Sequence, residues 1–376
     1  MLRNSELFFL KNKTNSGFAN RVSNSKVHIK VKRHNGYIDS YSIAKLIGDL
    51  NDVLFQHGNE NLHLIIEFDK GGFKDKLVYI LCECICSVLI EYAGACVNVK
   101  LDNKPSITTY GIMHTCMRSL ENKNGFGDFI NKFRFDILGP HYRRIIDNDY
   151  IRFEDYLCKI MQEICSFLCN LGVDAEAADE LSEVISEVAG NAFDHAKAEC
   201  LIDIDVAQDY VNNKTNQLCY GINVVVINFG ENLLGDDISK KIQNQDLIDK
   251  RLEKVITAYN QQKQHFNDHY GCEDFFNIMA FQHGISGRNE LTSTGGTGLT
   301  CLINSICEKS EANSCYVMSG DKILVFEEGY LTYNNDKWIG FNKDNDISVP
   351  PDYKLIHRSN AYLSGVAYNL NFVINR

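Results

Sequence analysis

Strand-like and helix-like segments alternate through the first hundred residues, and this alternation limits the folds that the chain can adopt. The alternating apolar and polar residues of a strand occur three times, at residues 27–33, 61–69 and 96–102. Between them, residues 42–58 and 77–94 have the apolar spacing of helices, and each segment ends at a glycine. Strands that alternate with helices predict a small α/β layer. We assign this layer to residues 27–145, because Pro105, a glycine-containing loop and Pro140 cluster near its end.

The most apolar stretch, residues 77–99, is long enough to raise the question of a membrane span. Glu83 and Glu91 interrupt it, and each carboxylate would cost roughly 2–4 kcal/mol at the centre of a bilayer. Gly94 then ends the run before the next strand. A buried helix followed by a strand is therefore the better interpretation, and we expect no membrane partner.

Charge and cysteine usage narrow the class of protein further. The chain has 38 basic and 49 acidic residues and a formal net charge of -11, which argues against direct binding to nucleic acid over its whole surface. Cys82, Cys84 and Cys86 alternate within an apolar helix, as small buried residues do. The first residues lack the long apolar stretch and the cleavage site of a signal peptide. We therefore expect a reducing, cytoplasmic setting.

A chain of 376 residues is long enough for two or three domains, and its pattern predicts two. Residues 1–26 have the character of a flexible basic arm, since the first 34 residues hold eight Lys or Arg and one acidic residue. The layer at 27–145 follows. We assign residues 146–376 to a second domain, which ends in a hairpin with its turn at Gly320 and a final strand.

Three motifs in the second domain are candidates for chemistry, and the first lies in a predicted helix over 175–198. Glu187, Asn191 and His195 are spaced four residues apart, so they share one face of this helix. A carboxylate can accept a proton from an attacking water or hydroxyl group, and a carboxamide oxygen can bind Mg²⁺. A solvated helix face without chemical function explains the same spacing, so both interpretations stay open.

The second motif lies where a strand rich in valine and isoleucine ends, at Asn228 and Gly230. A glycine at this place lets a ligand approach the backbone, and the side chain of Asn228 can hydrogen-bond the amino group of adenine. An ordinary exit from a strand into a turn explains these residues equally well.

The third motif is rich in glycine, serine and threonine and precedes the apolar helix 299–309. It contains Ser286 and Arg288, followed by Thr294, Gly295, Gly296, Thr297, Gly298 and Leu299. Glycines before a helix let backbone N–H groups face a phosphate, and Arg288 adds a fixed cation with several donors. The Walker pattern is absent, and a plain glycine-rich turn is the alternative.

Together and in this order, the three motifs resemble those of the GHKL family of ATP-binding proteins. This family includes sensor histidine kinases, anti-sigma-factor kinases, gyrase-type topoisomerases, mismatch-repair ATPases and large heat-shock chaperones. The resemblance covers about residues 150–376 and is strongest for the bacterial regulatory branch, whose first motif often reads E-x-x-x-N-A-x-x-H-A, as residues 187–196 do. It implies an α+β two-layer sandwich in which a mixed sheet carries helices on one face. The amino-terminal segment is similar in element order to a STAS-type module, the fold of anti-sigma-factor antagonists.

The resemblance implies a role for each matching position. Glu187 corresponds to the general base, Asn191 to the Mg²⁺ ligand, and His195 to the edge of the nucleotide pocket. Asn228 stands where the family has an adenine-reading aspartate, and Gly230 is the first glycine of that motif. The other cofactor-binding positions belong to the glycine-rich motif and are Ser286, Thr294, Gly295, Gly296, Thr297, Gly298 and Leu299.

Two departures from the family bear on the nucleotide. Asn228 replaces the usual aspartate, and Asn232 replaces the second glycine of that motif. Asparagine keeps an acceptor oxygen, so ATP with Mg²⁺ is still the expected cofactor pair, while the preference for a base is left open. The segment at about 233–294 is long for a nucleotide lid, and we expect it to hold helices.

The leading hypothesis is an Mg²⁺-dependent, ATP-binding regulatory switch that hydrolyses ATP slowly, with Arg288 stabilising the developing charge. Closure of the lid would control the amino-terminal module or a regulatory partner protein, and a homodimer is compatible with this arrangement. The same pocket fits a Ser/Thr protein kinase of the anti-sigma type, or a non-catalytic nucleotide-binding module. A metal site at His265, His269 and Cys272 is disfavoured, because no fourth ligand is evident.

Overall fold

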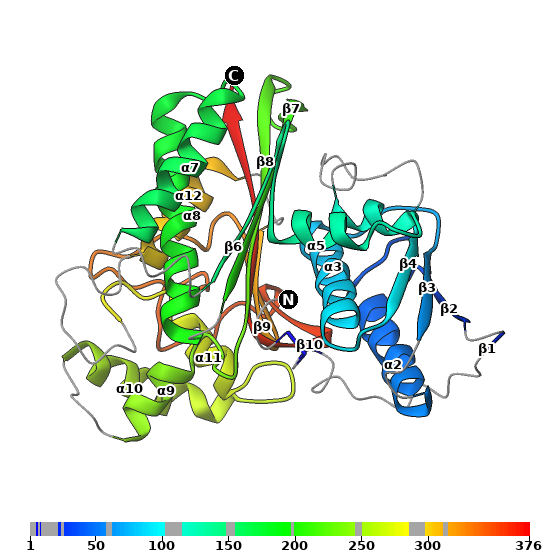
Figure 1. Cartoon of the computed structure of the whole chain (residues 1–376). Helices are drawn as coiled ribbons and strands as arrows, with labels where there is room; N and C mark the ends of the chain where they lie inside the picture. Colours follow the sequence, from blue (N-terminus) through cyan, green and yellow to red (C-terminus); the bar gives the residue numbers. More distant parts are fainter. Residues whose placement is uncertain are drawn as a thin grey trace.

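The chain has a mixed α/β fold with two sheets (Figure 1). The structure is a computed structural model that describes residues 5–6, 8, 22–23, 26–57, 62–101, 115–147, 155–196, 199–244, 250–285, 298–310 and 315–376. We call residues 22–134 the amino-terminal module and residues 135–376 the carboxy-terminal module, after the sheet to which each contributes.

The first sheet has four strands in the order β1-β2-β3-β4. They are β1 (Val22–Ser23), β2 (Lys26–Val31), β3 (His63–Phe68) and β4 (Cys96–Lys100). The strands β2, β3 and β4 are parallel, and β1 is antiparallel to β2. Parallel neighbours need crossover connections, and α2 (Ser40–His57) and α3 (Lys76–Glu91) supply them. The alternation of strands and helices predicted from the sequence is therefore confirmed. The short helix η1 (Cys116–Glu121) and α5 (Phe126–Arg134) complete this module.

The second sheet has six strands in the order β5-β6-β7-β8-β10-β9. They are β5 (Phe135–Leu138), β6 (His141–Ile146), β7 (Cys200–Val211), β8 (Leu218–Phe229), β9 (Cys315–Phe326) and β10 (Ile356–Asn375). All pairings between these strands are antiparallel, so the expectation of a mixed sheet is wrong. Tight turns such as the one at Gly139, whose φ is 57°, return the chain along the neighbouring strand.

The predicted domain boundary at residue 145 falls inside β6. This strand pairs with β7 over its whole length, from His141 opposite Asp205 to Ile146 opposite Cys200. The second sheet therefore begins ten residues earlier, at Phe135, because the turn at Pro140 joins two of its strands and does not separate two domains.

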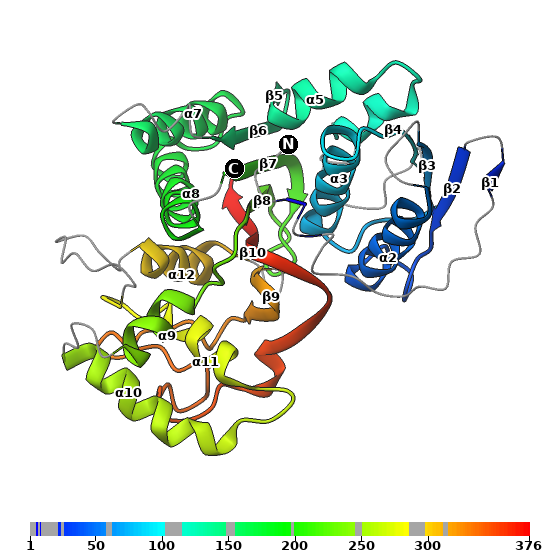
Figure 2. The ribbon, with the colours of Figure 1, turned by 60° about the horizontal axis from the view of Figure 1, so that its bottom comes forward.

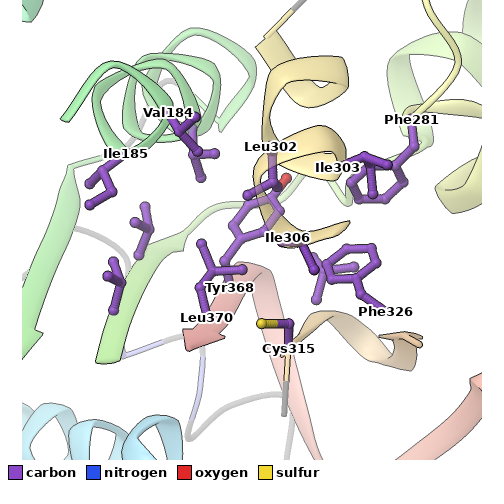
Figure 3. Close-up of a cluster of buried hydrophobic side chains, with 14 of the residues drawn as sticks. Val184, Ile185, Phe281, Leu302, Ile303, Ile306, Cys315, Phe326, Tyr368 and Leu370 are labelled. Atoms are coloured by element: carbon purple, nitrogen blue, oxygen red, sulfur yellow. The ribbon is translucent and has the colours of Figure 1, made fainter. Parts of the chain in front are cut away.

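Three helices cover one face of the six-stranded sheet (Figures 1 and 2). They are α7 (Tyr156–Asn170), α8 (Ala175–Ala196) and α12 (Gly298–Lys309). Figure 3 shows the core between them, in which side chains of α8 and α12 meet β10 through Val184, Ile185, Leu302, Ile306, Tyr368 and Leu370. The other face packs against the amino-terminal module, including its helix α3.

The segment predicted to be a helical insertion does contain helices, which lie together below the sheet in Figure 1. They are α9 (Asp236–Gln243), α10 (Lys250–Gln262), η2 (Lys263–His265) and α11 (Cys272–Met279). The connection between β9 and β10, which includes η3 (Tyr353–Leu355), packs against them. The side chain of Gln262 donates to the carbonyl of Ile347 at 2.6 Å, and the guanidinium of Arg251 lies 4.2 Å from the centre of the Trp338 ring. This segment is therefore a packed part of the module.

The predicted hairpin turn at Gly320–Asp321 is wrong. β9 runs through these residues as one strand of 12 residues and pairs with both halves of β10. Gly320 does have a positive φ of 64°, but the register shifts between Arg358 and Val366 of β10 lie opposite it. A glycine in this conformation suits a bulge as well as a turn, and here it accommodates a bulge.

Helix α3 lies between the two sheets (Figures 1 and 2). All of its residues from Lys76 to Ile90 are buried, so the interpretation as a buried helix is confirmed, including for Cys82, Cys84 and Cys86. It packs in one apolar cluster with residues of the six-stranded sheet such as Val225. No helix among the described residues is long and apolar enough to cross a membrane.

The start of the chain also contacts the carboxy-terminal module. Phe8 is 1% exposed, and its ring centre lies 5.9 Å from that of Phe229 at the end of β8. Ser5 is buried as well. The prediction of a flexible arm over residues 1–26 is therefore wrong for these positions, because an apolar side chain at the arm's start finds a partner in the core. Most of the predicted arm lies outside the described residues.

Candidate functional site

Helix α8 carries the first motif. It starts after Asp174, whose carboxylate accepts the N–H groups of Glu176 and Ala177 at 3.0 and 3.3 Å and so caps the first turn. Buried residues of α8 such as Val188 fix its position against the sheet. Glu187 and Asn191 are half-buried. Their four-residue spacing places them on one face of this helix, as predicted.

The start of α12 lies next to Glu187. Burial, and then the nearby carboxylates of Glu183 and Glu187, raise the pKa of Cys301 in the first turns of α12. The carboxylate of Glu187 therefore lies near the helix that follows the glycine-rich motif. Leu299, in the first turn of α12, packs against the same core as α8.

Asn228 lies near the end of β8, on the face that α8 covers. Alternate residues of β8, including Val224 and Val226, pack into the core below α8, and Asn228 continues this row. Its side chain is fully buried, and its Oδ1 accepts the N–H of Val366 at 3.1 Å. This hydrogen bond fixes the carboxamide of Asn228 against the irregular part of β10.

Gly230 and its neighbours join β8 to β10. The N–H of Gly230 donates to the carbonyl of Ser364 at 3.0 Å, and its own carbonyl accepts the hydroxyl of Ser364 at 2.6 Å. Asn232, which stands where the family has a second glycine, accepts from the ammonium of Lys240 at 2.8 Å. These contacts tie the end of the second motif to the irregular part of β10, so the motif has a structural role.

Much of the third motif lies outside the described residues. This applies to Ser286, Arg288, Thr294, Gly295, Gly296 and Thr297. Gly298 is the first residue of α12, and the backbone of His195 lies in α8. Among the described positions, α8 and β8 therefore carry Glu187, Asn191 and Asn228 on the same side of the sheet, and Glu187 lies near the start of α12.

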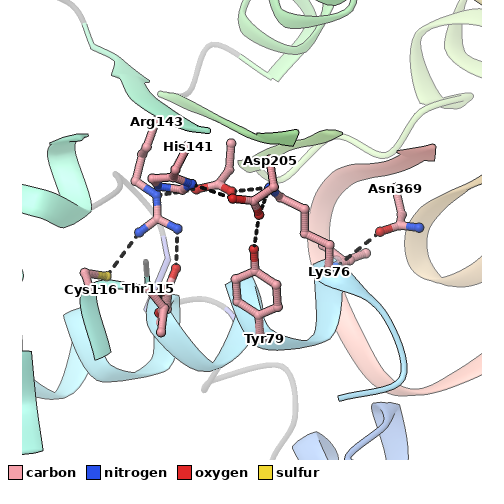
Figure 4. A network of polar contacts seen from close by, with 11 residues as sticks. Lys76, Tyr79, Thr115, Cys116, His141, Arg143, Asp205 and Asn369 are labelled. Carbon is pink, nitrogen blue, oxygen red and sulfur yellow. Dashed lines mark hydrogen bonds and ion pairs between the residues drawn. The ribbon is translucent and has the colours of Figure 1, made fainter. Parts of the chain in front are cut away.

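The structure also contains a buried polar cluster that the sequence did not reveal (Figure 4). We call it the interface cluster, because it joins α3 to β6 and β7, and its members are Lys76, Tyr79, Glu83, Thr115, Cys116, His141, Arg143, Asp203 and Asp205. The ammonium of Lys76 lies 2.6 Å from Oδ1 of Asp203 and 2.5 Å from Oδ2 of Asp205. Arg143 donates from Nε to Asp203 at 2.5 Å and pairs with Glu83 through Nη2.

The charges of this cluster shift the pKa values of its members. Burial acts to raise the pKa values of Asp203 and Asp205, but Arg143 and Lys76 outweigh burial, so both pKa values are lowered. Burial acts to lower the pKa of His141, but the two aspartates outweigh it, so this pKa is raised. When His141 is protonated, the three basic side chains of the cluster balance its three carboxylates.

Three members of the cluster have the geometry of a metal site. Donor atoms of His141, Asp203 and Asp205 all lie within 4.8 Å of one another. Lys76 and Arg143 already place cationic groups against the two aspartates, however, and a divalent cation would have to displace them. We therefore interpret the cluster as a charged joint between the modules.

A signal for the interface cluster does exist in the sequence. His141 and Arg143, and likewise Asp203 and Asp205, are separated by one residue in their strands, and the residues between them, Tyr142 and Ile204, are apolar and buried. Charged residues with a period of two place a row of charge on one face of a strand. This pattern alone does not show which surface pairs with the charged rows, because α3 is distant from both strands in the sequence.

The disfavoured metal site is dispersed in the structure. Nε2 of His269 lies 2.9 Å from the carbonyl of Tyr353, and the thiol of Cys272 lies 3.8 Å from the hydroxyl of Tyr259. Within the described ranges, these residues and His265 do not form a group of metal ligands.

Comparisons with known proteins do not suggest a function, so a proposal has to be based on the geometry of the site. Protein-family models, curated proteins and solved structures were all compared with the chain, and none of them matches it.

Proposed function

We propose that the carboxy-terminal module is an Mg²⁺-dependent ATP-binding switch of the GHKL type that hydrolyses ATP slowly. The observation that supports this most is the convergence of three motif residues from distant parts of the sequence. Glu187 and Asn191 of α8 and Asn228 of β8 lie on the same side of the sheet, and Glu187 lies beside the start of α12. The layer of helices α7, α8 and α12 on this face adds support, since the resemblance implies a helical layer against the sheet, although it implies a mixed sheet and this one is antiparallel.

The chemistry of the described side chains suits this proposal. Glu187 would orient and deprotonate the attacking water, and Asn191 would offer an oxygen to Mg²⁺. Glu183, one turn before Glu187, adds a second carboxylate near Cys301, so the site has the negative potential that a divalent cation neutralises. Asn228 would contact the adenine amino group through its carboxamide oxygen, as the resemblance implies.

A route for regulation runs through the sheet. Alternate residues of β8 face α8, and the others, such as Val225 and Ile227, pack in the cluster around α3. A nucleotide that moves the end of β8 would therefore change the packing of the amino-terminal module. The segment that follows β8 leads into the helices α9 to α11. It is fixed to β9, because the N–H of Leu234 donates to the hydroxyl of Ser319 at 2.9 Å.

The test is Glu187→Ala, with Glu176→Ala, an exposed residue in the first turn of the same helix, as the matched control. We expect Glu187→Ala to bind ATP within about twofold of the unmodified protein and to lose phosphate release by about 100-fold or more, because only the proton acceptor is removed. The control should keep its turnover. Calorimetry with ATP, in Mg²⁺ and in EDTA, measures binding, and released phosphate measures turnover.

The outcomes separate the alternatives. Absence of ATP binding by the unmodified protein would sink the proposal, and so would unchanged turnover in Glu187→Ala. Transfer of labelled phosphate to a partner protein would favour the Ser/Thr kinase. Binding without any turnover would favour the non-catalytic module, a second candidate that the hydrogen bond between Asn228 and Val366 supports, since it gives Asn228 a structural role.

A further inference from the structure

A cavity of about 600 Å³ lies between the start of α3 and the strands β8, β9 and β10. Its lining comes from both modules, and Figure 4 shows one lining residue of each, Lys76 and Asn369, beside each other. Cavities of roughly 300–1,000 Å³ between domains are common places for small-molecule ligands. It opens on the face of the sheet that packs against α3, whereas the ATP site proposed above lies on the opposite face.

The floor of this cavity is polar where the sheet face is otherwise apolar. Asn223, Asn369 and Asn371 occupy it, whereas Val225 and Ala367 on the same face belong to the apolar cluster around α3. Asn223 and Asn371 are directly opposite each other in the register of β8 and β10, which brings their side chains side by side. Asn223 is half-buried, and its carboxamide makes no hydrogen bond to any described residue. Its carboxamide is therefore accessible to a hydrogen-bonding ligand or to water in the cavity.

The two side walls of the cavity are apolar. Leu77 and Leu81 of α3 form one wall, and Met318, Ile323 and Val325 of β9 form the other. Carboxamides both donate and accept hydrogen bonds, so the floor suits the edge of a ring that does the same. A flat ring between two apolar walls, with its polar edge on the floor, would satisfy both features.

The rim of the cavity is positively charged. Lys74 and His357 are exposed there, and neither has an ion pair within the described part of the chain. The other basic residues of the lining have carboxylate partners, which are Asp203 and Asp205 for Lys76, Glu327 for Lys354 and Asp274 for Arg358. A ligand with a negative group near the rim would therefore meet Lys74.

The start of α3 is not the source of this charge. Asp75 accepts the N–H of Val78 at 3.0 Å, and Asn369 accepts the N–H of Leu77 at 3.2 Å, so the first turn is already capped. Burial raises the pKa of Asp75, and the hydroxyl of Tyr316 donates to its carboxylate at 2.9 Å. The carboxylate of Asp75 thus has protein partners and does not need a ligand.

We propose that this cavity binds a small organic anion with a planar, hydrogen-bonding ring. The ring lies between α3 and β9, its edge contacts Asn223 and Asn371, and its negative group lies near Lys74. Mononucleotides and heteroaromatic carboxylates share this chemistry. Such a ligand contacts both modules and stabilises their arrangement. The site is independent of the proposed ATP site.

The experiment uses the full chain in EDTA, without Mg²⁺, and calorimetry with AMP, GMP, CMP, UMP and orotate. The first variant is Asn223→Leu, with Asn213→Leu in the turn between β7 and β8 as its control. The second variant is Lys74→Gln, with the exposed Lys70→Gln as its control. A thermal melt of each variant checks that it is folded.

We expect at least one probe to bind, and binding by a nucleotide or by orotate alone identifies the source of the anion. Asn223→Leu should weaken this binding by about tenfold or more without lowering the melting temperature, since leucine extends the apolar face. Lys74→Gln should weaken binding of a nucleotide by about threefold to tenfold and leave the matching nucleoside unchanged. Both controls should bind as the unmodified protein does.

Three results would overturn the proposal. The first is that none of the five probes binds. The second is that Asn223→Leu binds as tightly as Asn213→Leu. The third is that Glu187→Ala abolishes binding while Asn223→Leu retains it, because the probe would then occupy the proposed ATP site. Failure of ATP to bind in Mg²⁺ has no bearing on this cavity, so the two proposals can fail separately.

Discussion

Asn228 shows how one residue can have both a structural and a chemical role. Its backbone and side-chain oxygens both lie against Gly365 of β10, whose φ is 128°. A Cβ at residue 365 would come within 2.3 Å of the carbonyl oxygen of Asn228 and within 2.8 Å of its Oδ1. The position of Asn228 therefore depends on the absence of a side chain at residue 365.

Replacing this glycine should be costly. We expect Gly365→Ala to lower the free energy of unfolding by about 2–4 kcal/mol, because it combines a strained φ with a collision against backbone. Gly127→Ala in α5 is the control, since a Cβ there meets nothing within 4 Å. That change should stabilise the protein by about 0.5–1 kcal/mol. Urea denaturation measures both, and a loss below about 1 kcal/mol for Gly365→Ala would contradict the expectation.

The residues of the candidate site differ in how far the sequence could predict them. Helical spacing was enough to place Glu187 and Asn191 on one face of α8, because that geometry is local. The hydrogen bond between Asn228 and Val366 spans 138 residues, so no local pattern could reveal it. For the same reason, the sequence indicated charged residues in β6 and β7 but did not show that α3 pairs with them.

At the scale of elements, α3 is the helix on which both sheets depend. One row of its side chains packs against the first sheet, and another reaches the interface cluster on β6 and β7. Lys76 is 3% exposed and lies against two buried aspartates. The charge of Lys76 therefore decides whether two carboxylates are compensated inside the protein.

We expect Lys76→Met to lower the free energy of unfolding by about 3–5 kcal/mol, because it leaves Asp203 and Asp205 without their ammonium partner. Lys74→Met is the matched control, two residues away and exposed, and should change stability by less than about 0.5 kcal/mol. Denaturant unfolding near neutral pH measures both. Equal stability of the two variants would show that the buried ion pairs contribute little.

The elements themselves were predicted with uneven success. The strands and helices of the first sheet follow from short patterns with clear periods, and the structure has them. The turn at Gly320 was wrong because a glycine with positive φ occurs in bulges as well as in hairpins. The boundary at residue 145 was wrong because a turn inside a sheet has the same residues as a linker between domains.

At the scale of the whole molecule, the two modules share their apolar interior. Residues of β8, β9 and β10 pack in one cluster with residues of α2, α3 and the first sheet. Removing either module would therefore expose the apolar surface of the other. The sequence indicates two domains in succession, but it does not show that they are joined through a common core, since this depends on contacts between distant segments.

A shared core predicts a single unfolding transition. We expect differential scanning calorimetry of the full chain to give one peak, with a calorimetric enthalpy equal to the van't Hoff enthalpy, because unfolding either module exposes the apolar surface of the other. Two separate peaks, one of which is absent from a chain truncated to residues 135–376, would show that the modules unfold independently.

The position of α3 has a consequence for synthesis of the protein on the ribosome. Lys76 is made 129 residues before its partner Asp205, and Leu77 is made 292 residues before Asn369. At about 5–20 residues per second, the nascent chain exposes an apolar helix with three thiols for many seconds before the second sheet exists to cover it. The contacts of α3 with β6 and β7 can form only after residue 205 has been made, and its contact with Asn369 only after most of β10 has been made.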